Sequence, residues 1–183
     1  MIIDGKFVVA AARDEAWANL SDLPSLAPLL PGCESIQPVD GGAYAVTAQA
    51  KVGPIKTRLA GKMSVVELSA PEAMRLRVEG QDTLTGSHVR ANLGFTLASV
   101  GERQTEVQYS ADVLISGRLG MIGQGIMRET VATMLGEFVR RLTARITGET
   151  IEETGLAALS VKAAARALKT GVTSLFERKE AQP

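Results

Sequence analysis

Little of the side-chain chemistry that most enzymes and metalloproteins use is present in this chain. Its 183 residues include one cysteine, Cys33, and one histidine, His88. A single cysteine excludes an intramolecular disulfide and a paired-cysteine zinc or iron–sulfur centre. A single histidine excludes a multi-histidine metal centre. Because nothing local pairs Cys33 with His88, we interpret the cysteine as a small, mostly apolar side chain. We expect no catalytic residues, no metal site and no enzymatic activity.

Aromatic side chains and an excess of one charge are scarce as well. The chain has one Trp, two Tyr and four Phe, and its 20 Lys and Arg equal its 20 Asp and Glu. General nucleic-acid binding needs surplus cations to displace phosphate counterions, and single strands are commonly held by stacked aromatic rings. The composition therefore argues against a nucleic-acid partner.

Long apolar runs are also missing. No stretch approaches eighteen uninterrupted apolar residues, so we expect no transmembrane helix. Residues 1–6 lack the basic region and the apolar run of a secretory signal. A cytoplasmic location is the expectation.

The periodicity that is present predicts one strand, two short helices and then a sheet. Residues 2–10 are rich in β-branched side chains and are typical of a strand. Residues 11–20 have helical spacing, and a second short helix is expected at about 25–30, before Pro31-Gly32. From 34 to 116 the apolar residues alternate with polar ones between turn signals, which predicts an antiparallel meander of six to seven strands in all.

A long amphipathic helix is predicted next. Apolar side chains recur every three or four residues along it: Leu119, Ile122, Ile126, Thr130, Met134, Phe138, Leu142 and Ile146. We expect a helix of about 30 residues that faces the sheet, with its charged residues on the solvent side: Arg128, Glu137, Arg140, Arg141 and Arg145. The element order predicts an α+β, helix-grip domain over residues 1–148, in which a curved sheet surrounds the long helix and the short helices close one end.

The net charge of zero conceals an uneven distribution of charge along the chain. Residues 156–183 carry a net charge of +3, so residues 1–155 carry −3. We predict a linker and a basic amphipathic tail over 149–183. Its expected contact residues are Lys162, Arg166, Leu168, Lys169, Val172, Leu175 and Phe176. An interfacial helix on an anionic membrane, a helix packed on a partner or on the domain, and a solvated tail all remain open.

Several local strings occur in a recognisable order. They include Leu30-Pro31-Gly32-Cys33-Glu34, Lys51-Val52-Gly53-Pro54-Ile55-Lys56 and Gly117-Arg118-Leu119-Gly120. Over residues 1–148 the chain resembles the CoxG family of carbon monoxide dehydrogenase subunits, within the START-like (SRPBCC) superfamily. The resemblance implies a START-like helix-grip fold with an internal apolar cavity and no chemistry performed by the protein itself.

The resemblance also implies a function. Family members are proposed to link a molybdenum hydroxylase of the carbon monoxide dehydrogenase type to the cytoplasmic membrane, or to carry a quinone between the two. We therefore expect a bound menaquinone, ubiquinone or other lipid, no catalytic cofactor, and peripheral attachment to the inner face of the membrane. The expected cavity residues are Leu29, Leu30, Val46, Phe95, Leu119, Ile122, Ile126, Met127 and Met134.

Two alternatives belong to other classes of protein. A ligand-free recruitment or maturation factor would contact the dehydrogenase and carry nothing. A cyclase-type or hydrolase-type enzyme shares this fold, since fold alone does not decide function, but the shortage of histidine, cysteine and paired carboxylates argues against it.

Overall fold

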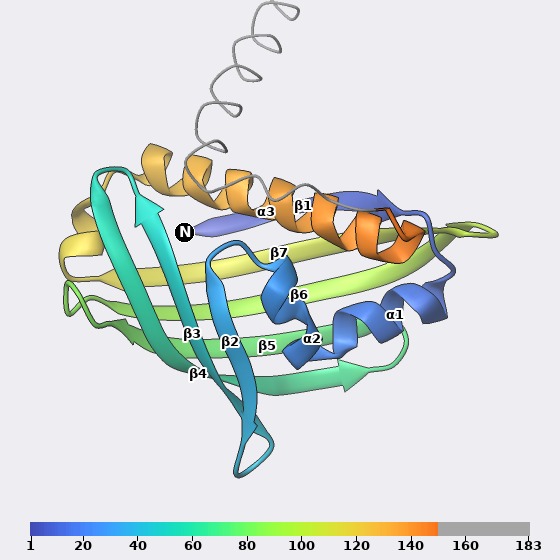
Figure 1. The fold of residues 1–183 in the computed structure, drawn as a ribbon, viewed down its shortest axis with the longest axis horizontal. Helices are drawn as coiled ribbons and strands as arrows, with labels where there is room; N and C mark the ends of the chain where they lie inside the picture. The colour runs from blue at the N-terminus through green and yellow to red at the C-terminus, as the bar shows by residue number, and fades with distance from the viewer. Residues whose placement is uncertain (150–183) are drawn as a thin grey trace, which may run out of the picture. The chain divides into compact units, whose positions relative to one another are not determined.

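One antiparallel sheet curls around a long helix (Figure 1). The computed structural model describes residues 1–149. The chain divides into Met1–Thr150 and Ile151–Pro183. The predicted linker and tail therefore lie outside the described residues, apart from Glu149.

The elements follow the predicted order. They are β1 (Ile2–Val9), α1 (Arg13–Ser21), α2 (Leu23–Leu26), the 3-10 turn η1 (Ala27–Leu29), β2 (Cys33–Val39), β3 (Ala43–Val52), β4 (Ile55–Ser69), β5 (Ala73–Asp82), β6 (His88–Gly101), β7 (Gln104–Ser116), the 3-10 turn η2 (Arg118–Met121) and α3 (Gln124–Thr147).

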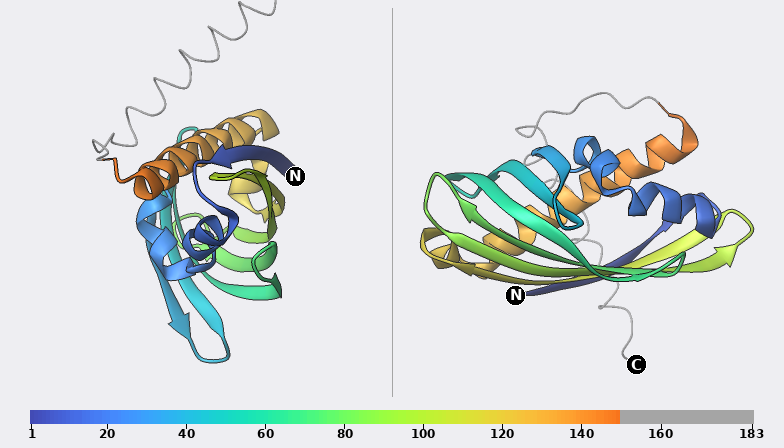
Figure 2. Two further views of the ribbon diagram at one scale, coloured as in Figure 1. Left: turned by 90° about the vertical axis from the view of Figure 1, so that its right-hand side faces the viewer. Right: turned by 90° about the horizontal axis from the view of Figure 1, so that it is seen from below.

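The sheet has the strand order β1-β7-β6-β5-β4-β3-β2, with every neighbouring pair antiparallel. Strands β2 to β7 form a meander, and β1 lies beside the last strand of that meander, with Val9 opposite Thr105. The short helices follow β1 and lie beside the C-terminal half of α3 (Figures 1 and 2). The predicted α+β helix-grip architecture is confirmed.

A pair of glycines allows the middle of the sheet to bend. Gly61 of β4 lies opposite Gly80 of β5. A Cβ at Gly61 would be 2.5 Å from the Glu79 carbonyl oxygen, and one at Gly80 would be 2.8 Å from the Ala60 carbonyl oxygen. Only glycine permits so close an approach of two backbones, and this contact lets the two strands coil around the helix.

The long helix begins later than its apolar repeat predicts. Leu119 lies in η2, Ile122 is extended, and α3 has 24 residues rather than about 30. The reason is the glycine content of residues 117–125. Gly117 has φ +81°, and a Cβ at Gly120 would be 2.7 Å from the Ile115 carbonyl oxygen. Backbone conformation and close packing therefore override the helical spacing of the apolar side chains.

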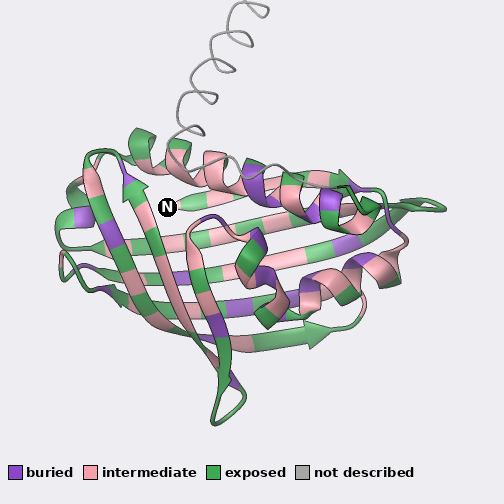
Figure 3. Cartoon of the chain, viewed as in Figure 1, coloured by how far each residue is buried: buried purple, intermediate pink, exposed green. Residues whose placement is uncertain are grey.

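The fully buried core lies at the end of the sheet that α1 and α2 cover. Its members come from all layers: Val9, Leu20, Leu23, Leu26, Met74, Leu76, Leu97, Val107, Phe138 and Leu142. Figure 3 shows the same asymmetry along α3, whose buried residues lie in its C-terminal half.

Candidate ligand-binding site

The inward stripe of α3 becomes less buried toward its N-terminal end. Phe138 and Leu142 are 9% and 0% exposed. One, two and three turns before Phe138 on the same face, Met134, Val131 and Met127 are only half-buried. Since a helix packed on a closed core buries its whole apolar stripe, the N-terminal half of α3 does not pack fully against the sheet.

The sheet shows the same gradient on its inner face. In β5, Met74 and Leu76 are buried, whereas Val78, which points the same way, is half-buried. In β7, Val107 is 2% exposed, whereas Val113 on the same face is half-buried. The inner-face side chains Val78 and Val113 are therefore only partly covered, whereas Asp82 at the end of β5 and Val52 at the end of β3 are buried. We call this partly covered region between the sheet and the N-terminal half of α3 the hollow.

The predicted cavity residues do not all lie in one place. Leu29 belongs to the main core, and Leu30, Val46 and Phe95 pack against it as partly buried side chains. Phe95 also meets Trp17 of α1, with ring centroids 6.0 Å apart. Leu119 is buried in η2. Four of these five residues therefore belong to the packed core or lie against it, and the fifth, Leu119, is buried in η2.

The remaining predicted cavity residues lie near the hollow. Ile122, Met127 and Met134 are half-buried. Ile126 is 43% exposed and contacts the β3–β4 turn, where its Cγ2 lies 3.2 Å from the position that a Cβ would take at Gly53. This contact brings the N-terminus of α3 to the β3–β4 turn.

Glycines at the start of α3 have no packing explanation. A Cβ at Gly123 or at Gly125 would meet nothing within 4 Å. Each glycine near a helix end lowers helix stability by up to about 1 kcal/mol relative to alanine. Close packing therefore accounts for Gly120 but not for these two glycines, of which Gly123 is the N-cap of α3, a position where glycine costs little.

A buried polar cluster, which we did not predict from the sequence, fixes the loop between β5 and β6. The Asp82 carboxylate accepts hydrogen bonds from the Arg58 N–H (2.6 Å) and from the N–H and hydroxyl of Thr85. The hydroxyls of Thr85 and Ser87 are 2.8 Å apart, and Ser87 Oγ accepts a hydrogen bond from the Leu119 N–H at 3.0 Å. The cluster thus ties β4, the β5–β6 loop and η2 together.

The charge of Asp82 follows from these contacts. Burial opposes ionisation, but the hydrogen bonds from Thr85, the Arg58 N–H and the loop N–H groups outweigh burial and hold the pKa of Asp82 below its ordinary value of 3.8. The sequence signal that was available is the run of Asp, Thr and Ser around Gly86, which is typical of a side-chain-bonded turn.

The expectation that Glu137 lies on the solvent side of α3 is wrong. Its side chain is 3% exposed and accepts hydrogen bonds from Arg140 (2.6 and 2.8 Å) and Arg141 (2.7 Å). Arg141 and Arg145 also donate to the carbonyl oxygens of Pro28 and Ser25. Helical spacing could not reveal Glu137, because its burial depends on the short helices that lie beside α3.

Hydrogen bonds from Arg140, opposed by burial, keep the pKa of Glu137 below its ordinary value of 4.5. The carboxylate therefore remains charged and holds Arg140 and Arg141, of which Arg141 also binds α3 to η1.

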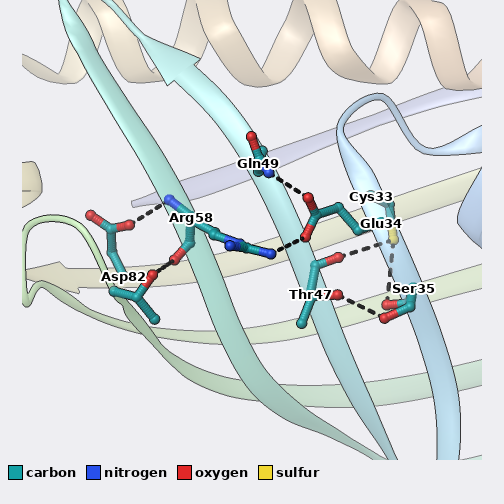
Figure 4. Close-up of polar contacts among 8 residues, drawn as sticks. Cys33, Glu34, Ser35, Thr47, Gln49, Arg58 and Asp82 are labelled. Carbon is teal, nitrogen blue, oxygen red and sulfur yellow. Dashed lines mark hydrogen bonds and ion pairs between the residues drawn. The ribbon is translucent and has the colours of Figure 1, made fainter.

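Cys33 and His88 lie far apart in the sheet. Cys33 begins β2, is half-buried, and directs its thiol to the carbonyl oxygens of Ser35 and Thr47 (Figure 4). Burial raises the pKa of the Cys33 thiol. His88 begins β6 and is exposed. Next to Cys33 in the chain, the Glu34 carboxylate accepts hydrogen bonds from the Gln49 amide and the Arg58 guanidinium across the outer face of β2, β3 and β4 (Figure 4).

Two predictions concern metals and membranes. Within residues 1–149, no group of three His, Cys, Asp or Glu side chains could hold a metal ion. No helix in that same range is long and apolar enough to cross a bilayer. The predicted contact residues from Lys162 to Phe176 lie outside the described part of the chain.

Solved structures share this fold. They include a conserved protein from Geobacillus kaustophilus (TM-score 0.74, 19% identity, 81% of this chain and 96% of that chain). A START superfamily protein from Mycobacterium smegmatis matches with TM-score 0.59 (13% identity, 80% and 97%). The Zhui aromatase/cyclase from Streptomyces sp. R1128 matches with TM-score 0.54 (14% identity, 81% and 92%). At these identities the likeness establishes the fold alone.

A search of curated protein sequences found no match. The family model of CoxG, a carbon monoxide dehydrogenase subunit, in contrast matches residues 5–147. That range includes the hollow, the Asp82 cluster and all of α3, so the match covers the whole helix-grip domain. The resemblance seen in the sequence is confirmed: the chain belongs to the CoxG family of carbon monoxide dehydrogenase subunits.

Proposed function

We propose that this protein is a non-catalytic accessory factor of a molybdenum hydroxylase of the carbon monoxide dehydrogenase type, and that it carries a respiratory quinone in the hollow. Membership of the CoxG family supports the accessory role. The residue chemistry agrees with it, since the pKa of the Cys33 thiol is raised by burial and His88 is exposed elsewhere in the sheet. A thiolate nucleophile needs a lowered pKa and a nearby base.

The observation that carries the proposal is the burial gradient. Half-buried Met127, Val131 and Met134 face half-buried apolar residues of the sheet. Exposed apolar surface in such an enclosed place is typical of a ligand site, which is mostly apolar with a few polar groups. Methionine side chains adapt to ligands of varied shape, and a flexible isoprenoid chain is such a ligand.

The inner face also offers a polar group suited to a quinone ring. Tyr109 is half-buried and lies on the same face as the core residue Val107. Burial raises the pKa of Tyr109, so its hydroxyl stays protonated and can donate a hydrogen bond. A quinone carbonyl accepts such a bond, and one or two donors are enough to orient a ring.

The chain's own elements would control entry. The Asp82 cluster holds the β5–β6 loop and η2 in place, whereas no neighbouring group packs against Gly123 and Gly125 at the start of α3. Movement of that first turn would break the contact of Ile126 with the β3–β4 turn and open the hollow. The ligand would then be exchanged at the inner face of the cytoplasmic membrane, with the basic tail (156–183) as a peripheral attachment.

The direct test is to purify the full chain from a quinone-containing host, extract it with solvent and identify bound small molecules by mass spectrometry. We expect menaquinone or ubiquinone in an amount that approaches one molecule per protein chain. An empty protein that also takes up no quinone from liposomes would refute the carrier role. A dehydrogenase that co-purifies with such an empty protein would identify a ligand-free recruitment factor instead.

A further inference from the structure

We infer that the open end of the helix-grip domain is itself a docking surface for an anionic lipid bilayer, separate from the basic tail. This end consists of the β3–β4 turn, the β5–β6 loop, η2 and the first turns of α3. The proposed exchange of an apolar ligand gives this docking a biological role, and the inference rests on the proposed function in that respect alone. Its evidence is the exposure, the charge and the placement of residues at this end.

Three loops and a helix end meet there. The Leu119 N–H bonds Ser87 Oγ, which joins η2 to the β5–β6 loop. Asp82 bonds the Arg58 N–H, which joins that loop to β4. Ile126 contacts Gly53, which joins the start of α3 to the β3–β4 turn. These links bring the four segments to one end of the domain, at the left in Figure 1.

Large apolar side chains of this end are exposed to water. Met121 of η2 is 81% exposed, Leu84 of the β5–β6 loop is 61% exposed, and Ile126 is 43% exposed. Neither the fold nor the hollow explains Met121 and Leu84, because neither packs on the core. Exposed apolar groups that gather on one surface mark an interaction site.

The same end is positively charged. Lys51, Lys56, Arg118 and Arg128 are exposed on these four segments, and Glu129 is the exposed acid among them. None of the four cations forms an ion pair within residues 1–149. Residues 1–155 carry a net charge of −3, so this cationic end stands out against the rest of the domain.

The placement of the two lysines has a structural cost. Lys51 and Lys56 lie directly opposite each other where β3 turns into β4. Like charges in such cross-strand pairs repel and destabilise a hairpin. An anionic surface would relieve that repulsion, which supports a negatively charged partner.

A bilayer suits these features better than a protein surface. Apolar side chains surrounded by cations are typical of segments that enter the boundary between headgroups and acyl chains. The surface also includes the first turns of α3, whose N-terminal half borders the hollow, so docking would bring an apolar ligand of the bilayer close to the hollow with little exposure to water.

The test uses the full chain and vesicles of phosphatidylcholine mixed with phosphatidylglycerol. One double variant removes apolar groups (Leu84→Ser with Met121→Ser), and another removes charge (Lys51→Gln with Lys56→Gln). Matched controls on the outer sheet face are Ile2→Ser with Leu114→Ser, and Lys62→Gln with Arg77→Gln. We expect the lysine variant to lower the partition coefficient roughly 30-fold, from two cations that each act near the surface, and the controls to leave it unchanged.

A fluorescent probe separates the open end from the tail. An environment-sensitive dye is attached at Met121→Cys, or for comparison at Leu114→Cys, with Cys33→Ser in both. On anionic vesicles the emission should shift to the blue at position 121 and not at 114, and added salt should reverse the shift.

Vesicle binding without a shift at position 121 would overturn the inference and place the contact elsewhere, for example in the tail. Equal binding of wild type and both open-end variants would overturn it too, as would an open-end variant that loses only co-purification of a dehydrogenase. A protein that shows the shift but contains no quinone would leave the inference intact while the carrier role fails.

Discussion

At the scale of single residues, the structure shows why the Pro31-Gly32-Cys33 turn requires a glycine at position 32. Gly32 has φ +77°, and a Cβ there would overlap the Gln49 carbonyl oxygen of β3. The Gln49 N–H also donates to the Gly32 carbonyl oxygen at 2.7 Å. The sequence predicts only a turn at this point, because the close approach of β3 is a long-range contact.

Substitution of Gly32 by alanine should destabilise the domain strongly. Left-handed backbone strain and the collision with Gln49 add, so we expect a loss of about 3 kcal/mol in the free energy of unfolding. Gly41 has a similar φ of +79° but open space around it, so Gly41→Ala should lose only about 1 kcal/mol. Urea unfolding of both variants measures the difference, and equal losses would contradict the close-approach argument.

Asp82 should make stability depend on pH in a defined direction. Its pKa in the folded protein lies below the ordinary value of 3.8. A lowered pKa gives stability that is fully present above the unfolded value and is lost as the pH falls through the folded value. The wild type should therefore lose stability below pH 3.8 more steeply than Asp82→Asn, in urea titrations over a pH series.

At neutral pH the Asp82→Asn variant should be less stable by about 3 kcal/mol, since an amide cannot accept all the hydrogen bonds that the carboxylate receives. Asp40→Asn is the matched control, because Asp40 is exposed in the β2–β3 turn. A loss at Asp40 as large as that at Asp82 would show that the buried cluster is not its source.

At the scale of elements, α3 shows what periodicity can and cannot predict. The apolar repeat correctly predicts a long helix that faces a sheet. It misplaces the start, because Gly117 and Gly120 have backbone requirements that arise from contacts with Ser87 and Ile115. It also misplaces Glu137, which is buried and bonded to Arg140 and to Arg141, while Arg141 reaches Pro28 of η1, 113 residues earlier.

Loss of the Glu137 carboxylate should loosen the attachment of α3 to the short helices. Glu137→Gln leaves Arg140 and Arg141 without their buried counter-charge. We expect a loss of about 2 kcal/mol, less than for a fully buried pair, because the Arg140 side chain is 43% exposed and water screens it. The control is Glu129→Gln, because Glu129 is an exposed carboxylate of the same helix. Thermal unfolding compares the two variants, and equal midpoint temperatures would contradict this role of Glu137.

At the scale of the whole molecule, the two ends of the domain differ in kind. The core under α1 and α2 is fully buried, whereas the apolar residues of the N-terminal half of α3, beside the hollow, are only partly buried. The sequence predicts both sets of apolar residues equally well, because periodicity reports which face is apolar and not how completely it is covered. This is why Leu29 and Phe95 lie with the core although they were predicted to line a cavity.

This difference predicts opposite outcomes for the same enlargement at two positions of α3. Leu142 is 0% exposed, so Leu142→Trp should overpack the core and lower the free energy of unfolding by about 1–3 kcal/mol. Val131 is only half-buried beside the hollow, so Val131→Trp should be accommodated with less crowding than Leu142→Trp and with little change in stability. It should also reduce the amount of quinone extracted from the purified protein, because the indole would occupy the ligand's place.

The comparison uses urea unfolding and solvent extraction on the same preparations. If Val131→Trp destabilises the protein as much as Leu142→Trp, the N-terminal half of α3 is packed and the hollow is not a ligand site. If Val131→Trp is stable and still contains as much quinone as the wild type, the ligand binds elsewhere on the domain. A stable variant that loses quinone but still recruits the dehydrogenase would show that carrying the ligand and contacting the enzyme use different surfaces of one molecule.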